Sequence, residues 1–154
     1  MKIAWTSAPY YGADSSASLG VSVSCSSARN CWGAGSTSIS PLVSRSIFVH
    51  WNGRHWASVK PPKLKDSALY GINCSSTGCW AVGDVGTFYR GTHSLVLHWN
   101  GSQWSRATRP SRKGSLFDVS CSSDKYCWAV GTLDSNSTSL NLVENWNGSA
   151  WSSL

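Results

Sequence analysis

An internal repeat of about 48 residues constrains the fold of this 154-residue chain more than any other feature. Two short motifs recur three times in the same order. One motif is a cysteine pair followed by Trp and Gly, found as SCSSARNCWGAG (24–35), NCSSTGCWAVG (73–83) and SCSSDKYCWAVG (120–131). The other motif is Trp-Asn-Gly-x-x-Trp, which ends at Trp56, Trp104 and Trp151. Because the phase holds along the whole chain, we infer a fold built from copies of one structural unit.

Each repeat predicts four short β-strands. The first is expected at Leu19–Cys25, Leu69–Cys74 and Leu116–Cys121, the second at Cys31–Gly35, Cys79–Gly83 and Cys127–Gly131, the third at Ile47–Trp51, Leu95–Trp99 and Leu142–Trp146, and the fourth from Trp56, Trp104 and Trp151 onward. The Asn-Gly pair before each fourth strand favours positive φ and marks a hairpin. No helical period of useful length occurs, so the predicted class is all-β.

Four strands in each unit, a fixed period and recurring Trp and Gly are typical of β-propeller blades. We therefore predict three four-stranded antiparallel blades in one domain of residues 1–154, at approximately 8–56, 57–104 and 105–151. Residues 1–7 are expected to form the outer strand of a preceding or closing blade, because Trp5 matches the start of the fourth strand. Propellers have about four to eight blades. The chain is then either part of a larger propeller or half of an oligomeric ring.

The motifs CWAVG and HWNGxxW resemble repeats of exported bacterial β-propellers, which are loosely kelch-like and BNR-like. The chain departs from kelch repeats because one Gly stands where kelch repeats have two. It departs from sialidase-type and WD blades because it has neither the Ser-x-Asp-x-Gly-x-x-Trp box nor a Trp-Asp pair. The resemblance implies a fold and export, and it implies no activity.

Six cysteines form three pairs in phase with the repeat, Cys25/Cys31, Cys74/Cys79 and Cys121/Cys127. Each pair flanks the turn between the first two strands, where facing hairpin positions come within reach of a disulfide. Free thiols and a metal site are the alternatives. The pairs lie a blade apart with no His between them, which disfavours metal. Disulfides predict a secreted or cell-surface protein, although the chain shows no signal peptide.

The sequence favours binding over catalysis. None of its seven Asp and Glu residues is paired by spacing, and it contains no phosphate-binding loop and no nucleophile elbow. We expect no enzyme activity, no cofactor and no metal. The periodic Trp residues are expected to pack between blades rather than to stack on sugars, and His50 and His98 to fill one polar position of the repeat. No apolar run is long enough for a membrane helix.

Charge predicts where a ligand would bind. The predicted topology brings one set of loops to one face, and these loops differ between repeats: 7–18, 36–46, 58–68, 84–94, 106–115 and 132–140. They hold nine of the thirteen basic residues and four acids, Asp84 among them. The candidate ligand-binding residues are Arg45, Lys60, Lys63, Lys65, Phe88, Tyr89, Arg90, Arg109, Arg112 and Lys113.

The predicted function is recognition of a carbohydrate or an anionic polymer or protein through this face. Nucleic acid and membrane insertion are not expected. Three alternatives stay open: the charges only keep the loops soluble, the chain is a fragment of a propeller hydrolase or lyase, or it is a purely structural blade array. Homo-oligomerisation, or continuation in further blades, is a further expectation.

Overall fold

The computed structural model describes residues 22–87, 91–108, 112–135 and 138–154, and this part of the chain is all-β. Twelve strands form three four-stranded antiparallel sheets, each in sequential strand order. The first sheet contains β1 (Ser22–Ser27), β2 (Asn30–Ser40), β3 (Val43–Trp51) and β4 (Trp56–Val59), the second β5 (Ser67–Cys74), β6 (Cys79–Thr87), β7 (Gly91–Trp99) and β8 (Trp104–Arg106), and the third β9 (Gly114–Ser123), β10 (Tyr126–Ser135), β11 (Thr138–Trp146) and β12 (Trp151–Ser153).

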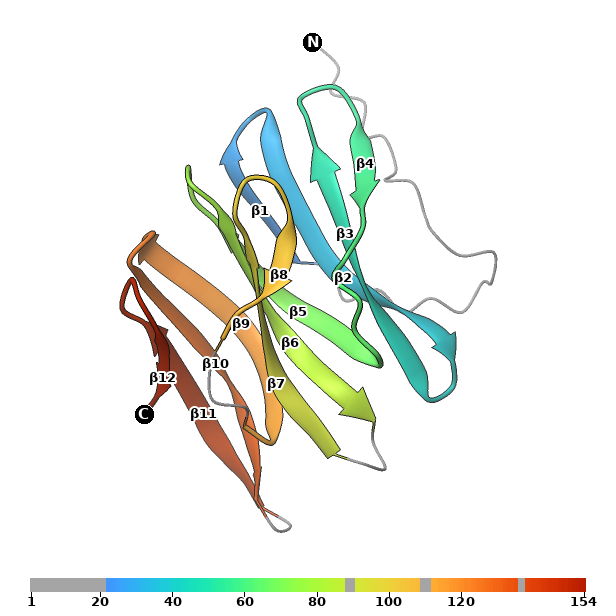
Figure 1. The fold of residues 1–154 in the computed structure, drawn as a ribbon, viewed down its shortest axis with the longest axis vertical. Helices are drawn as coiled ribbons and strands as arrows, with labels where there is room; N and C mark the ends of the chain where they lie inside the picture. Colours follow the sequence, from blue (N-terminus) through green and yellow to red (C-terminus); the bar gives the residue numbers. More distant parts are fainter. Residues whose placement is uncertain (1–21, 88–90, 109–111, 136–137) are drawn as a thin grey trace.

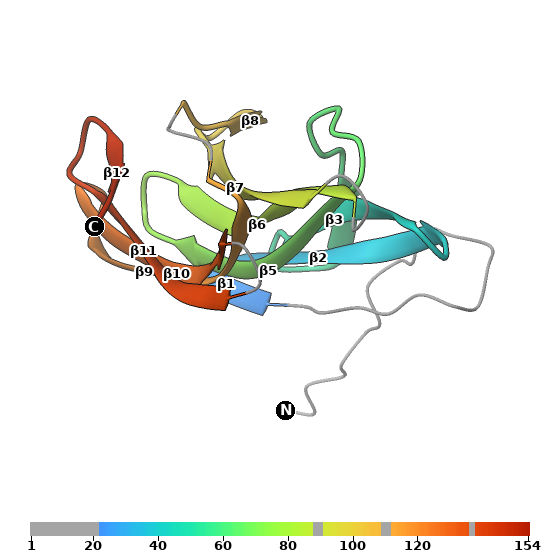
Figure 2. The same cartoon turned by 90° about the horizontal axis from the view of Figure 1, so that it is seen from below.

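The three sheets lie side by side like blades (Figure 1) and curve together when viewed from below (Figure 2). The first strand of the second and of the third sheet packs against the preceding sheet, since β5 contacts β1, β2 and β3, and β9 contacts β5, β6 and β7. The amide of Cys74 donates a hydrogen bond of 2.9 Å to Ser24 Oγ, and the amide of Ile72 one of 3.3 Å to Ser22 Oγ. The described residues thus form three blade-like sheets, and these do not close into a ring.

Two apolar clusters hold the sheets together, one at each junction. Trp32, Ala34 and Phe48 of the first sheet meet Leu69, Ile72, Ala81, Leu95 and Trp104 of the second. Trp80, Val82 and Val96 of the second sheet meet Leu116, Val119, Leu142 and Trp151 of the third. Successive strand residues point to opposite faces, so the middle sheet supplies Ala81 to one junction and Val82 to the other. This double burial explains why its second strand is a continuous apolar run.

The predicted strands are present, but the second and third strands of each sheet extend well beyond their apolar parts. The expectation that residues 36–46, 84–94 and 132–140 are loops is wrong for most of those that the structure describes, which lie in strands. For example, Ser36 pairs with Ser46 and Ser38 with Ser44. Ladder hydrogen bonds use the backbone, so polar residues continue a hairpin that the apolar pattern alone marks only in its buried part. The predicted start of the first strand, 19–21, lies outside the described residues.

The Trp-Asn-Gly-x-x-Trp motif forms a four-residue hairpin loop. Trp51 pairs directly with Trp56 across it. Gly53 has φ of 90°, and Asn52 Oδ1 accepts hydrogen bonds from the amides of Arg54 (3.0 Å) and His55 (3.1 Å). The loops at Asn100 and Asn147 repeat this pattern. The motif therefore encodes one turn: Asn closes it by mimicking a backbone turn, and Gly adopts the left-handed conformation.

The last Gly of CWAVG has a separate role at a β-bulge. A side chain on Gly83 would collide with the carbonyl oxygen of Ala68 on the neighbouring strand. Beside this contact the register between β5 and β6 shifts at Tyr70, which is left without a direct partner. A bulge re-aims its extra residue, and Tyr70 is 38% exposed. Gly131 and Phe117 occupy the same places in the third sheet.

Candidate basic pocket

The connection between β4 and β5, residues 60–66, forms one side of a pocket of about 430 Å³. Lys60, Lys63 and Lys65 come from this connection, and Arg45 comes from β3. Ser46, Pro61, Pro62, Leu64 and Ser67 complete the lining. All four basic side chains are exposed. The structure therefore brings four of the predicted ligand-binding residues around one hollow.

Buried contacts beneath the pocket fix its position. Ser46 and Ser67 are each 1% exposed, and the hydroxyl of Ser46 lies 2.8 Å from that of Ser67. The Ser46 amide also donates to Ser67 Oγ at 3.3 Å. These bonds tie β3 of the first sheet to β5 of the second. Leu64 packs against the first apolar cluster, so the basic residues stand on an anchored connection.

The pocket is positively charged. No acidic residue lines it, and its four basic side chains are exposed. The acid nearest in sequence, Asp66, lines a neighbouring hollow together with Tyr70 and Asp84. Like charges gathered on one concave surface raise the local concentration of anions. The two prolines fix the backbone between the lysines.

The remaining candidates do not line this pocket. Arg112 and Lys113 are exposed on the corresponding connection between β8 and β9. Arg112 Nε donates to Ser153 Oγ at 3.3 Å, and Lys113 pairs with His93 in an isolated bridge. Phe88, Tyr89, Arg90 and Arg109 lie outside the described residues. Their role in binding stays a prediction.

Asp84 was expected among the exposed charges of a surface loop, but it is buried within β6. It is 8% exposed at the junction of the second and third sheets. Its Oδ2 accepts hydrogen bonds from Ser115 Oγ (2.6 Å) and from the Tyr70 hydroxyl (3.1 Å). Burial raises the pKa of Asp84, and burial together with this carboxylate raises the pKa of Tyr70 to about 12. Its position directly after Gly83, at the end of an apolar run, was the available signal.

The Trp residues at the two junctions confirm the packing prediction, whereas Trp128 and the Trp51–Trp56 pair do not pack between sheets of the described residues. Trp32 and Trp80 are 2% and 8% exposed, and their rings lie 4.4 and 4.2 Å from those of His50 and His98. His50 Nε2 lies 2.6 Å from Asn30 Oδ1, and burial lowers the pKa of both histidines. Trp128 is 48% exposed, so the expectation that it is buried is wrong. The outer face of the third sheet, to which it belongs, has no neighbouring sheet among the described residues.

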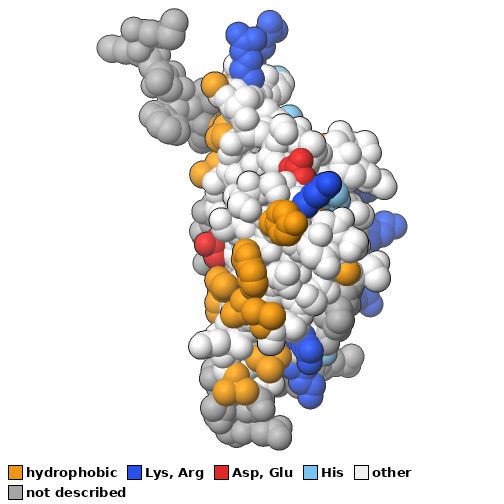
Figure 3. All heavy atoms as spheres, turned by 90° about the vertical axis from the view of Figure 1, so that its left-hand side faces the viewer, with side chains coloured by type: hydrophobic (Ala, Val, Ile, Leu, Met, Phe, Trp, Pro, Cys, Tyr) orange, Lys and Arg blue, Asp and Glu red, His pale blue; other side chains and the backbone are white. Residues whose placement is uncertain are grey.

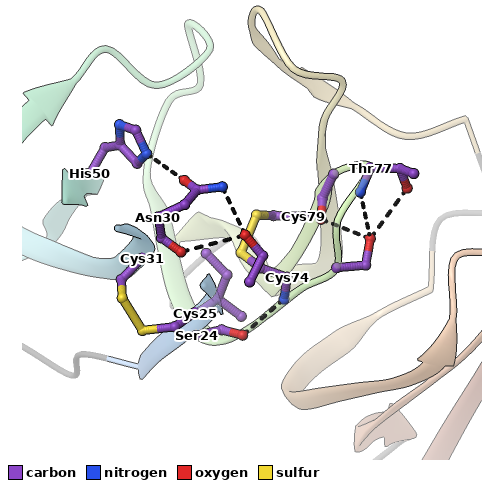
Figure 4. The surroundings of a disulfide bond; sticks show 12 residues. Ser24, Cys25, Asn30, Cys31, His50, Cys74, Thr77 and Cys79 are labelled. Atoms are coloured by element: carbon purple, nitrogen blue, oxygen red, sulfur yellow. Dashed lines mark hydrogen bonds between the residues drawn. A yellow bond between two sulfur atoms is a disulfide. The ribbon is translucent and has the colours of Figure 1, made fainter. Parts of the chain in front are cut away.

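All six cysteines form the three expected disulfides, Cys25–Cys31, Cys74–Cys79 and Cys121–Cys127. Figure 4 shows the first two beside each other, with the Ser24–Cys74 hydrogen bond between their strands. Free thiols and a cysteine-bound metal are thereby excluded as alternatives. The disulfides are consistent with an extracellular protein.

Neither a metal-binding cluster nor a membrane-spanning helix occurs in the described residues. No three His, Cys, Asp or Glu side chains there come together in a way that could hold a metal ion. None of the described segments forms a helix long and apolar enough to cross a membrane.

Comparison with known proteins adds no family. No family model matches the chain, and no curated protein matches it. The similarity to exported bacterial propeller repeats therefore depends on the motifs alone and stays a prediction.

Proposed function

We propose that the chain is a non-catalytic binding module that holds an anionic group of a carbohydrate, or of an acidic polymer or protein, in the basic pocket. The observation that carries this proposal is the arrangement of Arg45, Lys60, Lys63 and Lys65 around one hollow without a lining acid. The three disulfides support a place of action outside the cell or at its surface.

The composition of the pocket favours a sugar polymer with sulfate or carboxylate groups. Its volume lies within the range of about 300–1,000 Å³ that is typical of small-molecule sites. Pro61, Pro62 and Leu64 provide apolar surface between the positive charges. Such a lining can contact both the ring carbons and the charged substituents of an acidic sugar. Because the lysines are exposed, binding should weaken as salt rises.

Titration calorimetry with heparin, and separately with polygalacturonate, tests the proposal. The triple variant Lys60→Ser, Lys63→Ser, Lys65→Ser removes three charges from the rim of the pocket. Exposed charge contacts contribute roughly 0.2–1 kcal/mol each, so we expect affinity to fall about tenfold. The dependence of affinity on salt should become shallower in the same variant.

A matched control removes three charges from the other end of the sheets. Arg29, Arg54 and Lys125 lie on hairpin turns far from the pocket along their strands, and all are exposed. The variant Arg29→Ser, Arg54→Ser, Lys125→Ser has the same net charge as the pocket variant and should bind nearly as the unchanged protein does. Equal loss in both variants would show that only net charge matters, and the proposed pocket would be wrong.

A further inference from the structure

The outer face of the third sheet has the composition of a sheet junction, yet it is exposed. Trp128 and Val130 are 48% and 47% exposed. Their counterparts in the first sheet, Trp32 and Ala34, are 2% and 1% exposed, and those in the second, Trp80 and Val82, are 8% and 0%. Figure 3 views the molecule from this side and shows hydrophobic side chains gathered in its lower half.

The two junctions within the chain show what normally covers such a face. Trp32 packs against Trp99 and Trp104 of the next sheet, with ring centroids 4.6 and 5.4 Å apart. Trp80 packs against Trp146 and Trp151 of the third sheet, with ring centroids 5.0 and 5.2 Å apart. In both junctions the second Trp of the pair meets its partner edge to face, at 83° and 81°. Covering Trp128 in this way requires one more Trp pair of the same kind.

The first sheet carries this pair. The rings of Trp51 and Trp56 are 5.9 Å apart at 45°, close to the 5.9 Å and 46° of Trp99 with Trp104. Within the described residues, this pair receives no Trp from another sheet. Trp56 is only partly buried, whereas Trp104 and Trp151 are 5% and 3% exposed.

The first sheet also has an exposed apolar side chain at the position that the other two sheets bury in a junction. Val23 of β1 is 61% exposed. Its counterparts in the second and third sheets, Ile72 and Val119, are each 4% exposed in the two junctions. The chain therefore presents one half of a junction on its third sheet and the complementary half on its first.

We propose that the third sheet of one chain docks on the first sheet of a second copy, head to tail, through the contact that the chain already makes twice. Trp128 would enter the Trp51–Trp56 pair of the other copy. Ser120 occupies the place of Ser24 and would accept a hydrogen bond from the amide of Cys25, as Ser24 does from Cys74.

When two copies join in this way, the exposed face of the third sheet and that of the first sheet are covered in each chain. A head-to-tail interface forms either a closed ring or an open filament. Two copies supply six sheets, which lies within the four to eight blades of known propellers, whereas three copies would supply nine. The proposed assembly is therefore a dimer that closes a six-bladed ring.

Light scattering after size exclusion, without reductant, tests the dimer over roughly 1–100 µM protein. We expect a mass twice the 16.6 kDa of one chain. The variants Trp128→Arg and Trp56→Arg should each become monomeric, because each places a charge in the junction. Leu42→Arg is the matched control, since Leu42 is 57% exposed on the turn between β2 and β3, and it should remain a dimer. A monomeric unchanged protein, or a dimeric Trp128→Arg, would overturn the proposal.

Mixing the two monomeric variants separates a lost interface from a lost fold. The Trp128→Arg chain keeps an intact first sheet, and the Trp56→Arg chain keeps an intact third sheet. One complete junction can then form between them, so the mixture should contain pairs that neither variant forms alone. A misfolded variant would not do this. A mixture that stays monomeric at the highest concentration would contradict the head-to-tail contact.

Discussion

Asp84 shows how a single buried carboxylate links two sheets at a cost in free energy. Its hydrogen bonds with Tyr70 and Ser115 favour the charged form, but burial disfavours that form more strongly, and the pKa of Asp84 is raised. Since Ser115 belongs to β9 and Tyr70 to β5, the carboxylate joins the second sheet to the third. The molecule therefore retains the junction but is less stable when Asp84 is ionised.

This balance predicts a specific dependence of stability on pH. When the pKa of an acid is higher in the folded than in the unfolded protein, the folded state binds more protons between the two values, and the free energy of unfolding falls as pH rises. The contribution of Asp84 is fully present below its ordinary pKa of 3.8 and is lost as pH rises through the raised value. Asp84→Asn should remove this decline while keeping acceptors for both hydroxyls.

Urea unfolding between about pH 3.5 and 7 measures the effect. The control is Asp124→Asn, because Asp124 is exposed and hydrogen bonds from Ser75 and Thr77 lower its pKa. The control should leave the decline from Asp84 in place. An unchanged pH slope in Asp84→Asn would mean that this carboxylate is not the group responsible.

At the level of the hairpins, each disulfide closes a very short loop. Cys74 and Cys79 are five residues apart and face each other across β5 and β6. In the chain-entropy description a loop of this length stabilises the fold by about 2 kcal/mol. Cys74→Ala with Cys79→Ala should lower the free energy of unfolding by about that amount, measured by urea denaturation without reductant. The pair Cys121→Ala with Cys127→Ala should cost the same, and a loss under 0.5 kcal/mol in both would contradict the expectation.

The elements that repeat were predictable because their causes are local. Paired cysteines, the Asn-Gly turn and the apolar alternation act within one hairpin, and the sequence shows them three times. Strand ends such as Ser38 and Ser44 were missed, because backbone pairing there leaves no mark in side-chain polarity. Arg45 was expected on a loop and lies on β3 for the same reason.

Properties of the whole molecule depend on neighbours that no single repeat reveals. Trp128 has the same sequence context as Trp80, and only the absence of a covering sheet in the described residues makes it exposed. The clustering of Lys60, Lys63 and Lys65 was visible in the sequence, but their pocket requires Ser46 and Ser67 from two different sheets. Asp84 likewise acquires its burial from β9.

If both proposals hold, assembly changes how the protein binds a long polymer. In the proposed ring, the sheets of both copies have the same orientation. The connection that carries Lys60, Lys63 and Lys65 in each copy then lies on the same face, so the dimer presents two basic pockets there. Two linked sites convert the second binding event into an intramolecular one, which increases affinity for a ligand long enough to reach both.

Full-length heparin should therefore bind the unchanged protein much more tightly, per saccharide, than a heparin hexasaccharide does. The monomeric Trp128→Arg variant retains its single pocket, so its affinity for the hexasaccharide should be unchanged while the gain from chain length falls at least about tenfold. Calorimetry with the two ligands on both proteins measures the ratio. If the variant keeps the full gain, the two pockets do not act together on one face, whereas loss of hexasaccharide binding would mean that the substitution damages the pocket itself.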